Sequence, residues 1–173
     1  GMSLAENAIL SARQRRGLAS GGLLKLGKAS AYAAEIIRAF SVRATGPQAA
    51  ASSLSGGNLQ KYIMGREIMQ EPAVLVVAQP TWGVDAGAAG FIRQSMLDLA
   101  ARGSAVVVVS QDLDELLEIS DRIAVINGGR LSQPHPVGAI TLEEIGLLMG
   151  GVHGDGAGET HVETTGAEAG PHA

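Results

Sequence analysis

The segment Leu54–Lys61, which reads LSGGNLQK, has the residue types and spacing of an anion-binding site. Ser55 suits the N-cap of a helix, because its hydroxyl can accept a hydrogen bond from a first-turn amide. Gly56 and Gly57 carry no side chains, so several backbone N–H groups can point at one anion. The partial positive charge of a helix N-terminus favours the same ligand. An ordinary capped helix start has the same composition, so this segment alone leaves both interpretations open.

A second segment follows at a fixed distance. The apolar run Ala73–Ala78 leads into QPTWGVDAGA, at Gln79–Ala88. The order and spacing of the two segments resemble those of the ABC transporter ATPases, whose signature motif reads LSGGQ and whose next strand ends in DEPTxGLD. The resemblance covers residues from about 3 to about 150. The variants LSGGNLQK, AQPT and GVDAGAA, with the ending EIGLLMGG, are similar to the second half of the fused double ATPases of simple-sugar and nucleoside importers.

The resemblance implies a P-loop NTPase-type α/β fold in which two nucleotide-binding domains pack head to tail. The signature of one domain then contacts the γ-phosphate held by the other, and Asp85 lies in the loop that crosses their interface. On this basis the expected nucleotide-contacting residues are Ser55, Gly56, Gly57, Asn58, Gln60 and Asp85. The full assembly is expected to use ATP and Mg²⁺. Its implied partners are a second nucleotide-binding domain, membrane permease subunits and, indirectly, a substrate-binding protein, with the ATPase peripheral on the cytoplasmic face of the membrane.

Three positions depart from the catalytic pattern of this family. The strand after the signature should end in an Asp for Mg²⁺ and a Glu for the attacking water, but these positions hold Ala78 and Gln79. A glutamine cannot accept a proton from water at neutral pH. Gln111 stands where the family has its switch histidine. We therefore expect a degenerate hydrolytic site that donates its signature to a partner. Trp82 also departs from the usual Arg, and a surface aromatic at a subunit contact is preferred to a base-stacking role.

A phosphate loop is also missing from the expected place. The string Gly22–Lys28 approaches GxxxxGK[ST], but Ala29 follows it, no strand is expected before it, and it lies only about 30 residues before the signature. Such a loop needs a strand on one side and a helix on the other. The sequence is therefore interpreted as the C-terminal part of a nucleotide-binding domain, with no ATP expected to bind to this chain alone.

The element pattern predicts three regions. Residues 1–70 are expected to form a helical subdomain: a helix opened by the capping box Ser3–Glu6, a glycine-rich connector at 17–27, a helix over 30–40 and the signature helix to about Gln70. Residues 71–150 alternate strands (73–78, 104–109, 122–126) with helices (88–102, 112–119, 142–149), which predicts a mostly parallel sheet buried on both faces. A hairpin turn is expected at Asn127–Gly129. Residues 151–173 are poor in large apolar side chains and are expected to be disordered.

Composition excludes several classes of function. The net charge is −4, and all 13 Lys and Arg lie at or before Arg130, among 11 acidic residues. That part is only weakly basic, at about +2, which does not argue for nucleic-acid binding. The absence of cysteine excludes disulfides and thiolate metal sites, and no histidine has metal-ligand spacing.

An acidic helix face with a structural role is expected from Asp112, Asp114, Glu115 and Glu118. A catalytically inactive regulatory or protein-interaction module remains the alternative. A chromosome- or repair-type ATPase would need coiled-coil heptads and an acidic Asp-Glu pair.

Overall fold

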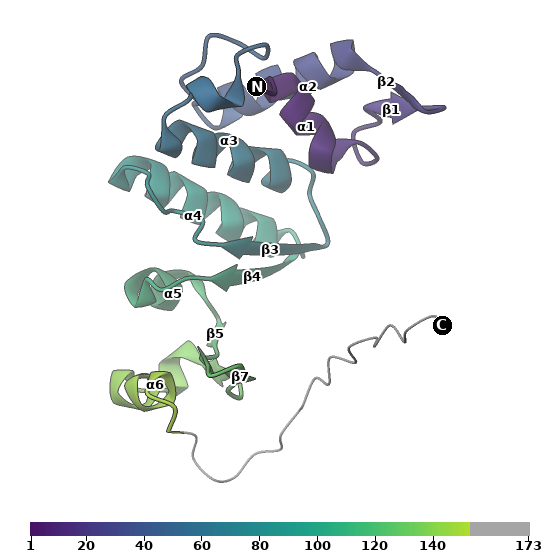
Figure 1. Cartoon of the computed structure of the whole chain (residues 1–173). Helices are drawn as coiled ribbons and strands as arrows, with labels where there is room; N and C mark the ends of the chain where they lie inside the picture. The colour runs from purple at the N-terminus through teal and green to yellow at the C-terminus, as the bar shows by residue number, and fades with distance from the viewer. Residues whose placement is uncertain (153–173) are drawn as a thin grey trace, which may run out of the picture. The chain divides into compact units, whose positions relative to one another are not determined.

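The computed structural model describes residues 1–152, so the disorder predicted for the tail lies outside the described residues, apart from Gly151 and Val152. Its contacts divide the chain into two units, residues 1–119 and the part from Ser120 onward, which are described separately. Figure 1 labels their elements. In the first unit these are α1 (Leu4–Ala12), β1 (Ala19–Ser20), β2 (Leu23–Leu24), α2 (Leu26–Ala39), a 3₁₀ turn (Ala51–Ser53), α3 (Gly56–Ile68), β3 (Val74–Ala78), α4 (Ala86–Ala101), β4 (Ala105–Val109) and α5 (Leu113–Ile119).

Helix α1 begins as its sequence predicts. The Glu6 amide donates to Ser3 Oγ at 3.2 Å, and Glu6 Oε2 accepts from the Ser3 amide at 2.7 Å. This reciprocal capping box satisfies two amides that a helix start would otherwise leave unpaired. Leu4 and Ala8 on the inner face of α1 are fully buried. Helix α1 therefore packs along α2 through a continuous apolar face.

The glycine-rich connector has a regular structure, which the sequence analysis did not predict. It forms an antiparallel hairpin in which Ala19 pairs with Leu24 and Ser20 with Leu23. Gly21 and Gly22 make the two-residue turn at φ 57° and 80°, the conformation that a tight hairpin needs and that glycine adopts without strain. The expectation that no strand precedes the Gly22–Lys28 string is wrong, because β1 lies before it. The string itself contains β2 and leads into α2, which begins at Leu26. Gly27 and Lys28 lie inside that helix, so the string is not a phosphate loop.

One apolar core joins the helices of the first unit. Tyr62 of α3 is fully buried, and its hydroxyl donates to the Leu4 carbonyl of α1 at 2.6 Å. Gly65 lets α3 approach α2 closely, since a Cβ there would lie 2.6 Å from a ring carbon of Phe40. The same core continues through Leu75 and Val77 of β3 to Ile92 and its neighbours in α4. No break falls at residue 70, so the boundary between regions 1–70 and 71–150 stays a prediction.

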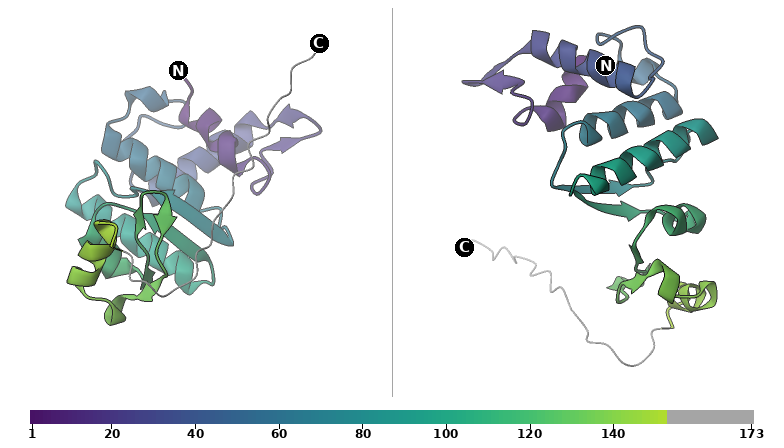
Figure 2. Two further views of the ribbon diagram at one scale, coloured as in Figure 1. Left: turned by 60° about the horizontal axis from the view of Figure 1, so that its bottom comes forward. Right: turned by 180° about the vertical axis from the view of Figure 1, so that it is seen from behind.

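Strands β3 and β4 form the expected parallel pair, with Val74 opposite Ala105 and Ala78 opposite Val109. Burial of the sheet differs from the expectation of two covered faces. Leu75 and Val77 point into the core, whereas Val74 and Val76 are 60% and 66% exposed. The views in Figures 1 and 2 agree that α4 lies along this strand pair, and α4 contacts β4. Within the described part of the chain, the second face of the pair is left to solvent.

The second unit contains β5 (Arg122–Ile123), β6 (Ile126–Asn127), β7 (Arg130–Leu131), β8 (His135–Pro136) and α6 (Leu142–Met149). The single strand expected over 122–126 is split, because β5 pairs with β8 and β6 pairs with β7. At the break, Ser132 Oγ accepts from the Val125 amide at 2.9 Å. The hairpin turn at Asn127–Gly129 is confirmed, with Gly128 and Gly129 at φ 55° and 79°. Helix α6 spans the expected residues.

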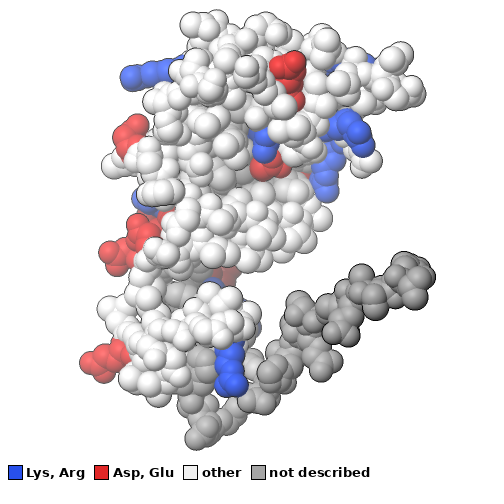
Figure 3. All heavy atoms as spheres, viewed as in Figure 1, with Lys and Arg blue, Asp and Glu red and all other residues white. Residues whose placement is uncertain are grey.

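The surface of the described residues is largely uncharged on the face drawn in Figure 3, with acidic and basic side chains in small separate groups. None of the described helices is long and apolar enough to cross a membrane.

Candidate functional site

The N-terminus of α3 is the centre of the candidate site. Ser55 occupies the N-cap position, but its side chain makes no cap hydrogen bond, contrary to the expectation from sequence. Its hydroxyl instead accepts from Asn58 Nδ2 at 2.9 Å. The side chain of Asn58 thus competes successfully with the backbone for the Ser55 hydroxyl. First-turn amides have no acceptor within their own helix, and the described residues supply none for the amides of Gly56 and Gly57.

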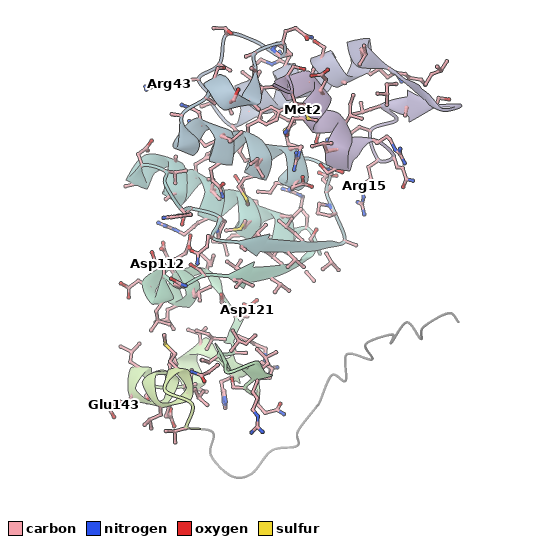
Figure 4. All side chains as sticks on the ribbon, in the orientation of Figure 1. Met2, Arg15, Arg43, Asp112, Asp121 and Glu143 are labelled. Carbon is pink, nitrogen blue, oxygen red and sulfur yellow. The ribbon has the colours of Figure 1, made fainter. Side chains whose placement is uncertain are left out.

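A recess of about 380 Å³ opens at this helix start. It gathers five of the six residues that the sequence analysis assigned to nucleotide contact. Its lining consists of Arg43, Ser55, Gly56, Gly57, Asn58, Lys61, Gly83 and Asp85. In Figure 4 the labelled Arg43 side chain points outward at the end of the helical layer where α3 begins. Arg43 precedes Ser55 by 12 residues, and Asp85 follows Gly57 by 28 residues. The fold brings both to the start of α3.

Gln60, the sixth assigned residue, does not line the recess. Its side-chain amide donates to the carbonyl of Gln79 at 3.2 Å and to that of Pro80 at 3.0 Å. Pro80 is almost fully buried. Gln60 therefore links the signature helix to the turn that follows β3.

The turn from Gln79 to Val84 lies tightly against the start of α3. A Cβ built on Gly57 would lie 3.0 Å from the Gly83 carbonyl oxygen and 3.4 Å from Val84 Cα. Around Gly56, by contrast, there is nothing within 4 Å. The two signature glycines therefore have different structural roles: Gly57 permits a close backbone approach, and Gly56 faces open space.

The recess carries two basic side chains that sequence reasoning did not assign. Lys61 lies one helical turn after Gly57, and its Nζ donates to the Ser41 carbonyl at 2.7 Å. Its i, i+4 spacing from Gly57 could have placed Lys61 on the same face of α3. No spacing in the sequence indicated Arg43, because only the fold brings it to the recess. Its backbone amide donates to Asn58 Oδ1 at 2.8 Å.

Asp85 places one carboxylate at the edge of the recess. It caps α4, with Oδ1 accepting from the Ala88 amide at 2.9 Å. This hydrogen bond, aided by the nearby charge of Lys61, holds the pKa of Asp85 below its ordinary value. The recess thus combines two cations, one anion and two free amides, an arrangement suited to an anionic ligand.

The positions that the sequence analysis expected to be degenerate lie at the carboxyl ends of β3 and β4, where open α/β sheets bind their ligands. Ala78 ends β3, and Gln79 follows it in the left-handed region at φ 51°, its amide donating to the Val109 carbonyl at 2.8 Å. Gln111 is exposed two residues after β4. Neither Ala78 nor Gln79 offers a carboxylate at the end of β3. Among residues 1–152, no group of three or more His, Asp or Glu side chains is placed to hold a metal ion.

The acidic face expected on the last helix of the first unit is partly wrong. Glu115 is only 3% exposed, and its Oε2 accepts from Ser110 Oγ at 3.2 Å. Its other carboxylate oxygen is buried without a partner among the described residues. Glu118 pairs with Arg93 of α4 at 3.1 Å. Glu115 is therefore a buried group bonded to Ser110. The alternation of apolar and acidic residues did not indicate this burial.

Sequence comparisons show which proteins this chain is similar to. No protein-family model matches the chain. It is 41% identical over 150 residues to the nucleoside import ATP-binding protein NupA of Lactococcus lactis, covering 87% of this chain and 30% of that protein. It is also 41% identical to the glucose import ATP-binding protein TsgD13 of Haloferax volcanii, of which it covers 28%. The ribose import ATP-binding protein RbsA 2 of Rhizobium meliloti is 33% identical over 97% of this chain and 32% of its own length.

Solved structures show the same fold. The dimeric ATP-binding cassette MJ0796 bound to ADP and Pi matches with a TM-score of 0.63 at 21% identity, over 79% of this chain and 57% of that one. An ATP-binding subunit of an ABC transporter matches with a TM-score of 0.66 at 17% identity, over 86% and 62%. The chain spans about a third of the length of the curated relatives. On the sequence evidence, it belongs to the family of ABC transporter ATP-binding proteins.

Proposed function

We propose that this chain is the C-terminal part of the second nucleotide-binding domain of a sugar or nucleoside importer, and that it presents the start of α3 to ATP held by a partner domain. The observation that carries this proposal is the pair of free amides at Gly56 and Gly57, in a recess that also holds Arg43 and Lys61. The import names of the curated relatives support the choice of transporter class.

The recess fits a phosphate group by its chemistry. Backbone N–H groups and the helix dipole attract negative charge, and a guanidinium and an ammonium add to that attraction. Gly56 leaves open space in front of its amide. When the nucleotide is bound in trans, these donors would neutralise charge on its terminal phosphate. Gln60 and Gly57 would hold the recess in shape through their contacts with the turn after β3.

The chain's own strand ends do not fit Mg²⁺ or a catalytic base. Ala78 has no ligand atom, Gln79 cannot take a proton from water at neutral pH, and Gln111 replaces the switch histidine. This half is therefore proposed to hydrolyse ATP poorly or not at all, and ATP and Mg²⁺ are proposed to belong to the full assembly. We expect this chain alone to bind neither.

The proposed partners follow from this role. The second nucleotide-binding domain would belong to the same full-length protein, permease subunits would anchor the ATPase on the cytoplasmic face of the membrane, and a substrate-binding protein would act through them.

A catalytically inactive regulatory module is the second candidate, because the fold is kept while Ala78, Gln79 and Gln111 lack catalytic groups. The reading frame upstream of Met2 discriminates the two. A phosphate loop encoded there would support the transporter subunit, and its absence would support the module.

The proposal is tested by measuring the steady-state rate of ATP hydrolysis by the assembled transporter with single substitutions in this chain. Gly56→Asp places a carboxylate in the open space of the recess. The Gly56 amide remains, but the carboxylate should keep a phosphate away from it. We therefore expect turnover to fall on the order of 10²–10³-fold, as when one pre-positioned donor is lost from an active site. Gln79→Ala should cost much less, because that position lacks a base.

Gly27→Asp is the matched control, since Gly27 also lies in the first turn of a helix and has nothing within 4 Å of its Cβ position. It should leave turnover unchanged. If Gln79→Ala abolished turnover while Gly56→Asp left it intact, this half would be the catalytic one and the trans-acting role would be wrong.

A further inference from the structure

The hairpin β1–β2 is a projecting, firmly based element that the proposed function does not use. The views in Figures 1 and 2 show it extending away from the helices of the first unit. Its base is fixed by two backbone hydrogen bonds, from Lys25 to the Leu18 carbonyl at 2.8 Å and from Leu18 to the Arg13 carbonyl at 2.9 Å. Leu18 itself is only 1% exposed. The hairpin is therefore held in one position by a buried anchor.

The outer part of this element exposes large apolar side chains. Leu23 is 75% exposed, Leu24 53% and Leu26 60%, and Leu10 of the adjoining α1 is 64% exposed. Such exposure contributes little to folding, because the hydrophobic effect scales with the apolar area removed from water. A hollow of about 580 Å³ between α1 and the hairpin is lined by Ile9, Leu10, Ser11, Arg13, Gln14, Arg15 and Leu24. The lining of this hollow is mixed: Ile9, Leu10 and Leu24 are apolar, and the other four residues are polar or basic.

Several cations lie close to these leucines in the sequence. Residues 1–30 contain five Lys and Arg side chains and one acidic side chain, Glu6, which is engaged in the capping box with Ser3. Two of the cations have internal roles: Arg15 donates to the Glu71 carbonyl at 3.2 Å, and Arg16 lies 4.7 Å from the Tyr32 ring centroid. The side chains of Arg13, Lys25 and Lys28 make no ion pair or hydrogen bond within residues 1–152. In Figure 3, Lys and Arg side chains gather beside an uncharged projecting end.

We propose that this hairpin surface binds an anionic lipid bilayer, with Leu23, Leu24 and Leu26 entering the headgroup region and Lys25, Lys28 and Arg13 facing lipid phosphates. Interfacial binding strength depends on the buried apolar area together with attraction to anionic lipids. The leucines and lysines of residues 23–28 supply both, on β2 and on the first turn of α2 that follows it. A projecting shape with free cations favours a bilayer over a concave protein partner. This binding does not depend on nucleotide or on the signature recess.

The chain offers a matched control in its other hairpin. Ile126 of β6 and Leu131 of β7 are 68% and 69% exposed, so they expose comparable apolar side chains on a second two-residue turn. Leu23→Gln with Leu24→Gln tests the proposed surface, and Ile126→Gln with Leu131→Gln tests the control. All four side chains are exposed, so neither double variant should disturb the core.

The experiment is flotation of the 173-residue protein with vesicles of phosphatidylcholine alone or with 30% phosphatidylglycerol. We expect binding to the phosphatidylglycerol vesicles only, a loss of about tenfold or more for Leu23→Gln with Leu24→Gln, and no change for the control. Lys25→Gln with Lys28→Gln should weaken binding by about fivefold per lysine, from roughly 1 kcal/mol for each cation near an anionic surface.

Three results would overturn the proposal. One is equal binding of the Leu23–Leu24 double variant and the unaltered protein. Another is binding that does not distinguish anionic from neutral vesicles. The third is an absence of vesicle binding altogether, which would assign the leucine and lysine surface to a protein partner.

Discussion

Replacing each signature glycine by alanine should separate a packing role from an access role. In Gly57→Ala, the added Cβ would lie 3.0 Å from the Gly83 carbonyl oxygen and 3.4 Å from Val84 Cα, both backbone atoms. The turn that holds them is fixed by hydrogen bonds from Val84 to Thr81 at 3.3 Å and from Trp82 to Gln79 at 3.2 Å. Because the turn cannot move freely, the methyl group should act as overpacking, which costs about 1–3 kcal/mol.

Gly56→Ala provides the reference for this cost. Both glycines lie in the first turn of α3, so both substitutions gain the same helix propensity, up to about 1 kcal/mol in a helix interior and less at its start. Gly56 has nothing within 4 Å of its Cβ position. The propensity terms cancel in the comparison, so Gly57→Ala should be less stable than Gly56→Ala by about 1–3 kcal/mol.

Thermal unfolding of the two variants measures this difference. For a protein of this size, 1 kcal/mol corresponds to roughly 2–4 °C in Tm, so Gly57→Ala should unfold at a clearly lower temperature. Trp82 is the only tryptophan of the chain and is 81% exposed beside Gly83, so its fluorescence anisotropy reports on the turn directly. Equal Tm values for the two variants, with an unchanged Trp82 signal, would refute the assignment of Gly57 to close packing.

Two further predictions concern carboxyl groups. Hydrogen bonds from Ser3 and from Thr141 hold the pKa of Glu6 and of Glu144 below 4.5, and the Ala88 amide holds that of Asp85 below 3.8. The stability from these caps is therefore present above those values and lost as the pH falls through the lower folded-state pKa. Helix content, followed by circular dichroism, should fall in this acid range. The fall should be smaller in the triple variant Glu6→Gln, Asp85→Asn, Glu144→Gln. Identical pH profiles for the variant and the unaltered protein would contradict this prediction. For Glu115, Glu115→Gln keeps an acceptor for the Ser110 hydroxyl and should be tolerated, whereas Glu115→Ala should cost about 1–3 kcal/mol in urea unfolding; equal losses would argue against the Ser110 contact.

Local signals in the sequence predicted those elements whose stabilising contacts are themselves local. The capping box at Ser3 and the turn at Asn127–Gly129 each involve residues within a few positions of one another, and both are confirmed. The hairpin at Ala19–Leu24 was missed although Gly21 and Gly22 supply its turn, because strands of two residues carry no periodic pattern. The Ser55 cap was wrong because Asn58, also local, offered its hydroxyl a competing partner.

The recess itself could be predicted only in part. Ser55 to Asn58 and Asp85 were found because their motifs resemble those of a known family, not because the sequence shows that they meet. Arg43 is brought to α3 by the path of the chain between α2 and α3, and a hydrogen bond from its amide to Asn58 fixes it there. Burial of Glu115 likewise depends on how α5 packs beside the end of β4, which no spacing of acidic residues reveals.

The contrast between the recess and the strand ends is the physical argument for the asymmetric role that we propose. At the start of α3, the fold keeps two amides free and maintains the recess through contacts from Gln60, Gly57 and Asn58. At the end of β3, Gln79 is held by the Val109 carbonyl and by Gln60, yet it presents no proton acceptor. Because Gln60 bonds directly to the Gln79 carbonyl, both sites share one rigid connection. A change that displaced Gln79 should therefore affect the recess through Gln60, while a change confined to the Gln79 side chain should not.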